Sequence, residues 1–159
     1  MTPRNRFALT VAAALVAGGL ITGCGTVYPR PDITANEAVV RVAELADEAM
    51  KQLPPGATLR ETLHADDMKC DDGPGDDRVF IETHYQIDYP QGWPVDDAVP
   101  TLADFWTGKA YETVRDERDD PQLPNFAVEA PDGFRISIDV TKRDNGTVDA
   151  YLNSSSPCL

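Results

Sequence analysis

Positive charge is scarce in this sequence. Its 159 residues include 14 Lys and Arg against 27 Asp and Glu, so the formal net charge is −13. Proteins that bind nucleic acid neutralise its phosphates with clustered basic side chains, and the sequence contains no Lys/Arg cluster. We therefore expect no nucleic-acid partner, and we expect any protein partner to be basic.

Histidine and cysteine are also scarce, with two His and three Cys in the chain. A metal site built from these residue types needs more of them than this chain supplies. His64 and His84 are the bases available to a nucleophile among Ser154 to Ser156, but these serines lack the setting of a nucleophile elbow. The spacing of the acidic residues does not indicate a glycosidase-type carboxylate pair either. We therefore expect no enzymatic activity and no cofactor.

Long apolar runs are confined to the N-terminus. Arg4 and Arg6 precede residues 7–21, which are apolar or small except for Thr10. A charged start followed by a short apolar run is typical of an export signal, and it is short for a membrane span of ~20 residues. Residues 20–24, with the sequence Leu-Ile-Thr-Gly-Cys, resemble a bacterial lipobox.

The lipobox resemblance implies that Cys24 carries a diacylglyceryl group and becomes the first residue once the signal peptide, residues 1–23, is removed. Two acyl chains anchor a protein stably because each buried CH₂ contributes ~0.8 kcal/mol. Cleavage removes two Arg and no acidic residue, so anionic headgroups repel the mature chain even more strongly. We expect a protein held by this lipid on the extracytoplasmic face of the cell membrane. The alternatives are an ordinary secretion signal and an uncleaved span.

Cys70 and Cys158 remain once Cys24 is assigned to the lipid. An even number of cysteines in an exported protein predicts a disulfide. The loop that it closes is long, so the chain-entropy model gives an upper value of about 4–5 kcal/mol for its contribution to stability.

The remainder of the chain divides into a tether, residues 24–33, and one domain, residues 34–159. Thr34 and Glu37 form the pattern of a capping box. Apolar residues then recur at spacings of three and four up to Leu53, which predicts an amphipathic helix that ends at Pro54-Pro55-Gly56.

Alternating apolar and polar residues predict most of the remaining elements. We expect a second helix around 100–107, capped by Asp96 or Asp97 and ended by Gly108. Residues 65–77 are acidic and rich in turn formers, so we expect a loop there. Strands are expected at 58–63, 79–89, 109–115, 125–129, 134–141 and 147–152, with tight turns at 131–133 and 144–146. This order predicts an α+β fold in which two helices pack on one face of an antiparallel sheet.

Several features together resemble small envelope lipoproteins of high-GC Gram-positive bacteria, of the mycobacterial and streptomycete type. They are the lipobox, the capped helix, Cys70, the Trp-Thr-Gly exit of the second helix at 106–108, the strand Gly-Phe-Arg-Ile-Ser-Ile at 133–138 and the ending Ser-Ser-Pro-Cys at 155–158. The resemblance implies an extracytoplasmic, lipid-anchored protein. It assigns no catalytic or binding residue beyond Cys24.

The densest acidic segment contains six Asp within residues 66–77. Oxygen ligands of this kind suit Ca²⁺, so Asp71, Asp72, Asp76 and Asp77 are candidates for a weak calcium site. Their spacing does not match an EF-hand, and a solvated, self-repelling loop is the simpler interpretation.

Trp93 lies between Gly92 and Pro94 in a turn, so we expect it to be the most exposed aromatic residue and a candidate surface patch. Two functions remain open. The first is a non-enzymatic interaction or assembly module in which the acidic surface meets a basic envelope protein. The second is a carrier for a small apolar molecule or lipid, which requires a cavity of several hundred Å³ between sheet and helices.

Overall fold

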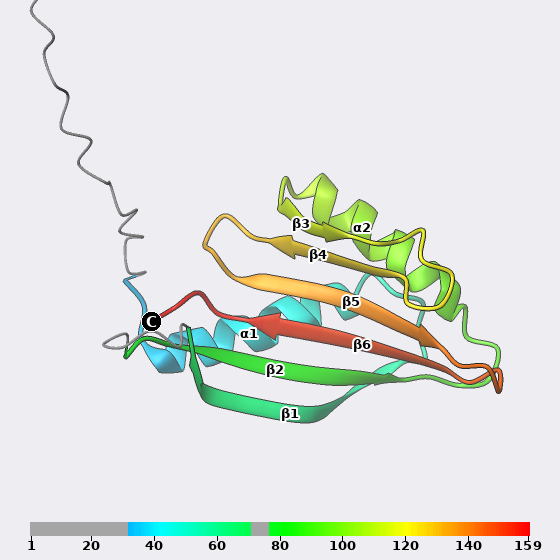
Figure 1. The fold of residues 1–159 in the computed structure, drawn as a ribbon, viewed down its shortest axis with the longest axis horizontal. Coiled ribbons are helices and arrows are strands. Elements are labelled where there is room, and N and C mark those ends of the chain that lie inside the picture. Colours follow the sequence, from blue (N-terminus) through cyan, green and yellow to red (C-terminus); the bar gives the residue numbers. More distant parts are fainter. Residues whose placement is uncertain (1–31, 71–76) are drawn as a thin grey trace, which may run out of the picture.

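The computed structural model describes residues 32–70 and 77–159. The predicted signal peptide, Cys24, most of the tether, and the calcium candidates Asp71, Asp72 and Asp76 lie outside these ranges. The described residues form two layers, a six-stranded sheet and two α-helices on one of its faces (Figure 1). The expected α+β fold is therefore confirmed.

The described elements follow one another in the order α-β-β-α-β-β-β-β, with a short 3₁₀ turn before the second helix. They are α1 (Ala35–Met50), β1 (Thr58–Lys69), β2 (Val79–Asp88), η1 (Val95–Asp97), α2 (Ala98–Gly108), β3 (Glu112–Asp116), β4 (Asn125–Glu129), β5 (Arg135–Lys142) and β6 (Val148–Ser155).

The sheet is antiparallel between all neighbouring strands, with the order β1-β2-β6-β5-β4-β3. Strands β3 to β6 form a meander, and β6 then pairs with β2, which joins the first hairpin to the second half of the chain. Helix α1 contacts β1, β2 and β6, whereas α2 contacts β4 and β5. The two helices thus cover separate parts of the same face.

Helix α1 begins as the sequence predicts. The Glu37 backbone N–H donates to Thr34 Oγ1 at 3.3 Å, and the Thr34 backbone N–H donates to Glu37 Oε2 at 2.8 Å. This reciprocal cap satisfies N–H groups that have no partner inside the helix. One face of the helix is buried against the sheet, and its buried residues are Ala38, Val42, Leu45, Ala46 and Ala49.

The hydrophobic core lies between the sheet and the two helices. Its largest buried side chains include Trp106 of α2 and Phe126 of β4, whose stacked rings have centroids 6.4 Å apart. Alternate residues of the central strands complete it, among them Ile81, Ile87, Ile136, Ile138, Val140 and Leu152. Each fully buried side chain of this size contributes roughly 1.5–3 kcal/mol, so this layer supplies most of the driving force for folding.

Strand β1 is longer than expected, and the prediction of a loop from residue 65 is wrong for residues 65–69. Met68 pairs with Phe80 and Lys69 with Val79, after a register shift between Ala65 and Met68. The acidic side chains do not prevent strand formation there, because β1 is an edge strand and most of its side chains remain exposed to solvent. Asp66 and Asp67 lie inside this register shift, and pairing of the residues on either side with β2 keeps the strand continuous despite their low strand propensity.

Trp93 is buried, with 8% of its surface exposed, so the expected surface patch is not formed. Its ring stacks on Tyr89 with centroids 5.1 Å apart, and its Nε1–H donates to the Pro54 carbonyl oxygen at 3.1 Å. The turn after β2 thus contacts the segment that follows α1. A turn position alone does not reveal such a long-range contact.

Helix α2 differs at both ends from the prediction. It begins at Ala98, and Asp97 stands at the N-cap without a side-chain hydrogen bond to the helix. Gly108 is the last helical residue, and the left-handed position is occupied by Ala110 with φ 58°. The Tyr111 and Ala110 N–H groups donate to Trp106 and Thr107 carbonyls, as in a Schellman motif. Because 109–111 complete this helix end, β3 starts later than we expected.

Cys70 and Cys158 are joined across the end of the sheet, with Cα atoms 6.0 Å apart. The segment after β6 continues along β2, where the Leu159 N–H donates to the Val79 carbonyl oxygen at 2.8 Å. The C-terminus therefore lies at the same end of the molecule as residue 32 and the start of α1 (Figure 1).

Candidate functional site

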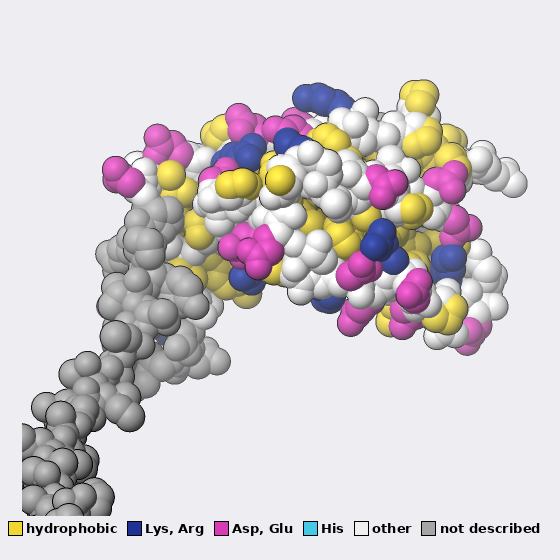
Figure 2. Space-filling view, turned by 90° about the horizontal axis from the view of Figure 1, so that it is seen from above, with side chains coloured by type: hydrophobic (Ala, Val, Ile, Leu, Met, Phe, Trp, Pro, Cys, Tyr) yellow, Lys and Arg dark blue, Asp and Glu magenta, His cyan; other side chains and the backbone are white. Residues whose placement is uncertain are grey.

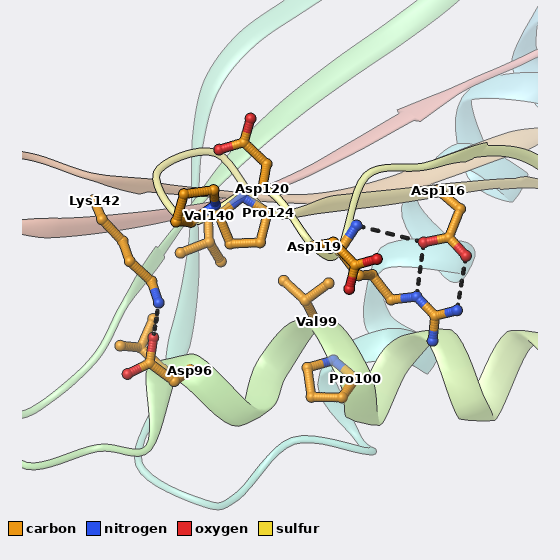
Figure 3. Close-up of a pocket in the computed structure, with 12 residues that line it drawn as sticks. Asp96, Val99, Pro100, Asp116, Asp119, Asp120, Pro124, Val140 and Lys142 are labelled. Atoms are coloured by element: carbon orange, nitrogen blue, oxygen red, sulfur yellow. Dashed lines mark hydrogen bonds and ion pairs between the residues drawn. The ribbon is translucent and has the colours of Figure 1, made fainter.

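A surface groove of about 760 Å³ lies between α2 and the connection from β3 to β4, residues 117–124 (Figure 3). Four separate parts of the chain line it: η1 with the start of α2, the end of β3, the connection itself and the end of β5. The lining residues are Val95, Asp96, Val99, Pro100, Asp116, Arg118, Asp119, Asp120, Pro121, Pro124, Val140 and Lys142.

The floor of the groove is apolar. Val99 of α2 and Val140 of β5 are nearly fully buried, with 3% and 1% exposed. Pro100 extends from the helix, while Pro121 and Pro124 belong to the opposite wall, as Figure 3 shows for the labelled residues Pro100 and Pro124. Three proline rings therefore line a groove whose base is closed by the hydrophobic core.

The wall formed by residues 117–124 is held in place by hydrogen bonds. Asp120 Oδ1 accepts from the backbone N–H groups of Gln122 and Leu123, each at 2.8 Å. These bonds, the one from Leu123 first, hold the pKa of Asp120 below its ordinary value of 3.8. The carbonyl oxygens of Gln122 and Pro124 accept from the β5 N–H groups of Lys142 and Val140, at 2.8 and 3.0 Å. These hydrogen bonds hold the wall in its conformation without a ligand.

One end of the groove carries a bidentate ion pair. The Arg118 guanidinium donates to both carboxylate oxygens of Asp116, at 2.8 and 2.7 Å, and it lies 4.9 Å from the centre of the Phe126 ring. The hydrogen bond from Arg118 holds the pKa of Asp116 below its ordinary value of 3.8. The stacking and the paired bonds fix this guanidinium in one orientation.

The other end carries a simpler pair. Lys142 Nζ lies 2.6 Å from Asp96 Oδ1, and the two side chains are 39% and 69% exposed. Figure 3 shows the two pairs at opposite ends, with Val99, Pro100, Pro124 and Val140 between them. Asp119 and Asp120 add two further carboxylates, so the four aspartates of the lining outnumber its two cations.

The groove combines apolar contact with an excess of carboxylate oxygens. Its lining contains no Ser, Cys or His, the residue types that most often act as nucleophile or base. The arrangement therefore suits binding of a molecule that has both an apolar part and a positive charge. On the side of the molecule that carries α2 and β3, acidic and basic side chains with hydrophobic atoms between them spread over the visible surface (Figure 2).

The histidines and serines that sequence analysis considered lie elsewhere. His64 Nδ1 is 2.9 Å from Thr83 Oγ1, and Thr83 in turn pairs across the sheet with Ser154. Ser154 is 1% exposed on the helix-covered face, which leaves no approach for a substrate. His84 lies on the opposite face, with Nε2 3.1 Å from Glu82 Oε1. Ser154, Thr83 and His64 therefore lie side by side on neighbouring strands, but the Ser154 side chain is buried.

Of the calcium candidates, Asp77 alone belongs to the described residues, so that site remains a prediction. Within residues 32–70 and 77–159, no group of three or more His, Cys, Asp or Glu side chains is arranged to hold a metal ion. In the same ranges, neither helix has the length and apolar character needed to span a membrane.

Sequence analysis missed the groove. The segment Asp-Pro-Gln-Leu-Pro at 120–124 was its clearest signal, because two prolines beside an Asx turn indicate a rigid connection. Nothing local indicates that this connection faces the start of α2.

Comparison with known proteins identifies no relative. No protein-family model matches the chain, and neither the curated proteins nor the solved structures contain a similar one.

Proposed function

We propose that this protein is a lipid-anchored, non-enzymatic interaction module on the extracytoplasmic face of a bacterial cell membrane, which binds a basic envelope protein through its acidic groove. The observation that carries the proposal is the composition of the groove, an apolar floor between walls in which aspartates outnumber cations. Such a surface discriminates by charge and by apolar contact without a reactive group.

The position of the groove supports this role. Residue 32, the start of α1 and the C-terminus lie at one end of the long axis, and the β3–β4 connection lies toward the other end (Figure 1). A lipid on Cys24 would attach the protein at the first end, so the groove would face away from the bilayer. Removal of residues 1–23 takes away Arg4 and Arg6 and changes the net charge from −13 to −15, so anionic headgroups repel the domain and keep it away from the bilayer surface.

The carrier alternative required a cavity between the sheet and the helices. The groove opens at the surface and has charged rims, which suits a protein segment better than a wholly apolar molecule. No observation within the described residues favours the carrier over the interaction module.

The anchoring part of the proposal is tested with Cys24→Ala. Cells that express the full chain are fed an alkyne-tagged fatty acid, and the protein is recovered from membrane and soluble fractions. We expect the parent chain to incorporate the tag and the variant to lose it. Equal incorporation of the tag into both chains would contradict lipid anchoring at Cys24.

The binding part is tested by cross-linking in intact cells. A photo-reactive residue replaces Pro121 in the groove, and a matched chain carries it at Val40, which is 58% exposed on α1. We expect a discrete adduct at 121 that is absent at 40, and mass spectrometry should place the cross-link in a Lys- or Arg-containing peptide of the partner. Identical adducts at both positions, or none, would contradict the proposal.

A further inference from the structure

We infer that the groove holds an extended segment of the partner in which a Lys or Arg adjoins a proline or aliphatic residue, and that this incoming cation displaces Lys142 from Asp96. The inference rests on the proposed function and specifies the chemistry of its partner. Three properties of the groove lead to it: the hydrogen bonds already made by its wall, the apolar floor, and the difference between its two ion pairs.

Backbone hydrogen-bonding groups in the wall of the groove already have partners within the protein. The carbonyl oxygens of Gln122 and Pro124 already accept from β5, and the prolines of the walls have no N–H to donate. A partner therefore cannot attach as an added β-strand along β5. It must be held through its side chains, which favours an extended segment over a strand of a sheet.

The apolar floor determines which side chains fit beside the cation. Val99 and Val140 are nearly fully buried, so the apolar surface that a ligand can contact comes mainly from the exposed Pro100 and Pro121 and the half-buried Pro124. A proline or aliphatic side chain would bury apolar surface there without leaving a polar group unpaired. A long polar segment would gain nothing from this floor.

The two ion pairs are unequal. Arg118 is fixed by two hydrogen bonds to Asp116 and by its position over Phe126, so displacing it would break several contacts. Lys142 makes one contact to Asp96 through a flexible stem, and the Asp96 side chain is 69% exposed, against 41% for Asp116. Exposed pairs of this kind are weak, and lysine acts as a point charge that rotates away readily. Asp96 is therefore the carboxylate that an incoming cation can take over.

Removal of Lys142 should consequently strengthen binding. Lys142→Met frees Asp96 and removes a competing cation, and we expect the affinity for a basic segment to rise about two- to fivefold. Asp96→Asn should lower it by a similar factor. The matched controls are Lys69→Met and Asp67→Asn, which make the same charge changes on the exposed strand β1 outside the groove.

The probe is a blocked synthetic peptide, Ala-Pro-Leu-Lys-Pro-Ala, titrated into the mature domain while the methyl resonances of valine are followed by NMR. Three further ligands complete the series: the peptide with Glu in place of Lys, the peptide with Ser in place of Leu, and spermidine. We expect the first peptide to shift the Val99 and Val140 methyls and to bind more weakly at high salt. The Glu peptide should not bind, and the Ser peptide and spermidine should bind less tightly.

Several results would overturn the inference. Equal effects of Lys142→Met and Lys69→Met would mean that only overall charge matters. Spermidine binding as tight as that of the first peptide would mean that no protein segment is required. Specific cross-links at 121 together with no binding of the first peptide would refute this partner chemistry while leaving the proposed function intact. Absence of a specific cross-link at position 121 in intact cells would instead refute the proposed function.

Discussion

The two halves of the sheet are stabilised in different ways. In the α1 half, comprising α1, β1, β2 and β6, the helix has a complete capping box and a disulfide joins Cys70 to Cys158. In the α2 half, comprising η1, α2 and β3 to β5, the helix begins without a side-chain cap and ends on a left-handed alanine. The groove lies in this second half, and its rim carries two exposed ion pairs, Asp116 with Arg118 and Asp96 with Lys142.

The two halves differ in how they are closed. The α1 half carries both ends of the described chain and is closed by a covalent bond, the disulfide. The α2 half has a firm apolar floor, but its rim is made of charges that can change partners. A site for reversible binding requires such a rim, because a ligand must replace existing contacts at little cost.

The largest effect is expected from loss of the disulfide. Cys70→Ser with Cys158→Ser releases a loop with a sequence separation of 88 residues. On the chain-entropy model this lowers the free energy of unfolding by about 4–5 kcal/mol. Thermal unfolding of the parent and variant measures the loss. Peptide binding by the groove, assayed well below the melting temperature, should persist, and its disappearance would show that the two halves are not independent.

A smaller loss is expected at Trp93, whose ring stacks on Tyr89 and donates a hydrogen bond to Pro54. Trp93→Ala removes a buried ring and should cost about 3–5 kcal/mol in urea denaturation. Trp93→Phe keeps ring stacking on Tyr89 but loses the hydrogen bond to Pro54, so its cost should be nearer 1 kcal/mol. Equal stability of the two variants would contradict the burial of this residue.

A gain in stability is expected at the end of α2. Ala110 is exposed and has φ 58°, a conformation that costs a residue with Cβ about 1–2 kcal/mol. Ala110→Gly should therefore stabilise the protein by about 0.5–1 kcal/mol after the greater flexibility of unfolded glycine is taken into account. The control is Ala35→Gly in the first turn of α1, which should not stabilise. A destabilised Ala110→Gly would show that the left-handed turn is not formed.

The smallest effect is a local response of the groove wall to acid. The folded-state pKa values of Asp116 and Asp120 lie below 3.8, because Arg118 and the backbone N–H groups of the wall favour their charged forms. Their contribution to stability is therefore complete above pH 3.8 and is lost as the pH falls through the folded-state values. Amide hydrogen exchange at residues 117–124 should accelerate in acid more than exchange in β2 and β6. Asp116→Asn with Asp120→Asn should remove that difference.

Local patterns in the sequence predict much of this fold. The capping box at Thr34, the alternation in β5 and the Asp-Asn-Gly turn before β6 each specify their own geometry, and the structure contains all three elements. The pairing of Cys70 with Cys158 also follows from sequence, because these are the two cysteines left after Cys24 is assigned to the lipid. The first three features depend on interactions within a few residues of the chain. The disulfide could be predicted because two cysteines remained to pair.

The predictions that failed depend on distant contacts. Strand β1 extends to Lys69 because β2 pairs with Ala65, Met68 and Lys69. Trp93 is buried against Tyr89 and the segment after α1 that contains Pro54. Ala110 adopts a conformation that local preference disfavours, because the helix end and the start of β3 require a turn at that point. Tertiary packing overrides propensity at these positions since burial and pairing outweigh a preference of about 1 kcal/mol.

The sequence by itself determined the class of this fold, the capped first helix, the cysteine pair and the net negative charge. Only the tertiary structure decided where acidic side chains lie beside an apolar groove. Periodicity reports which face of an element is buried, but not which elements become neighbours. Asp96, Arg118 and Lys142 come from three separate segments, and folding of the chain around one core places them along a single groove.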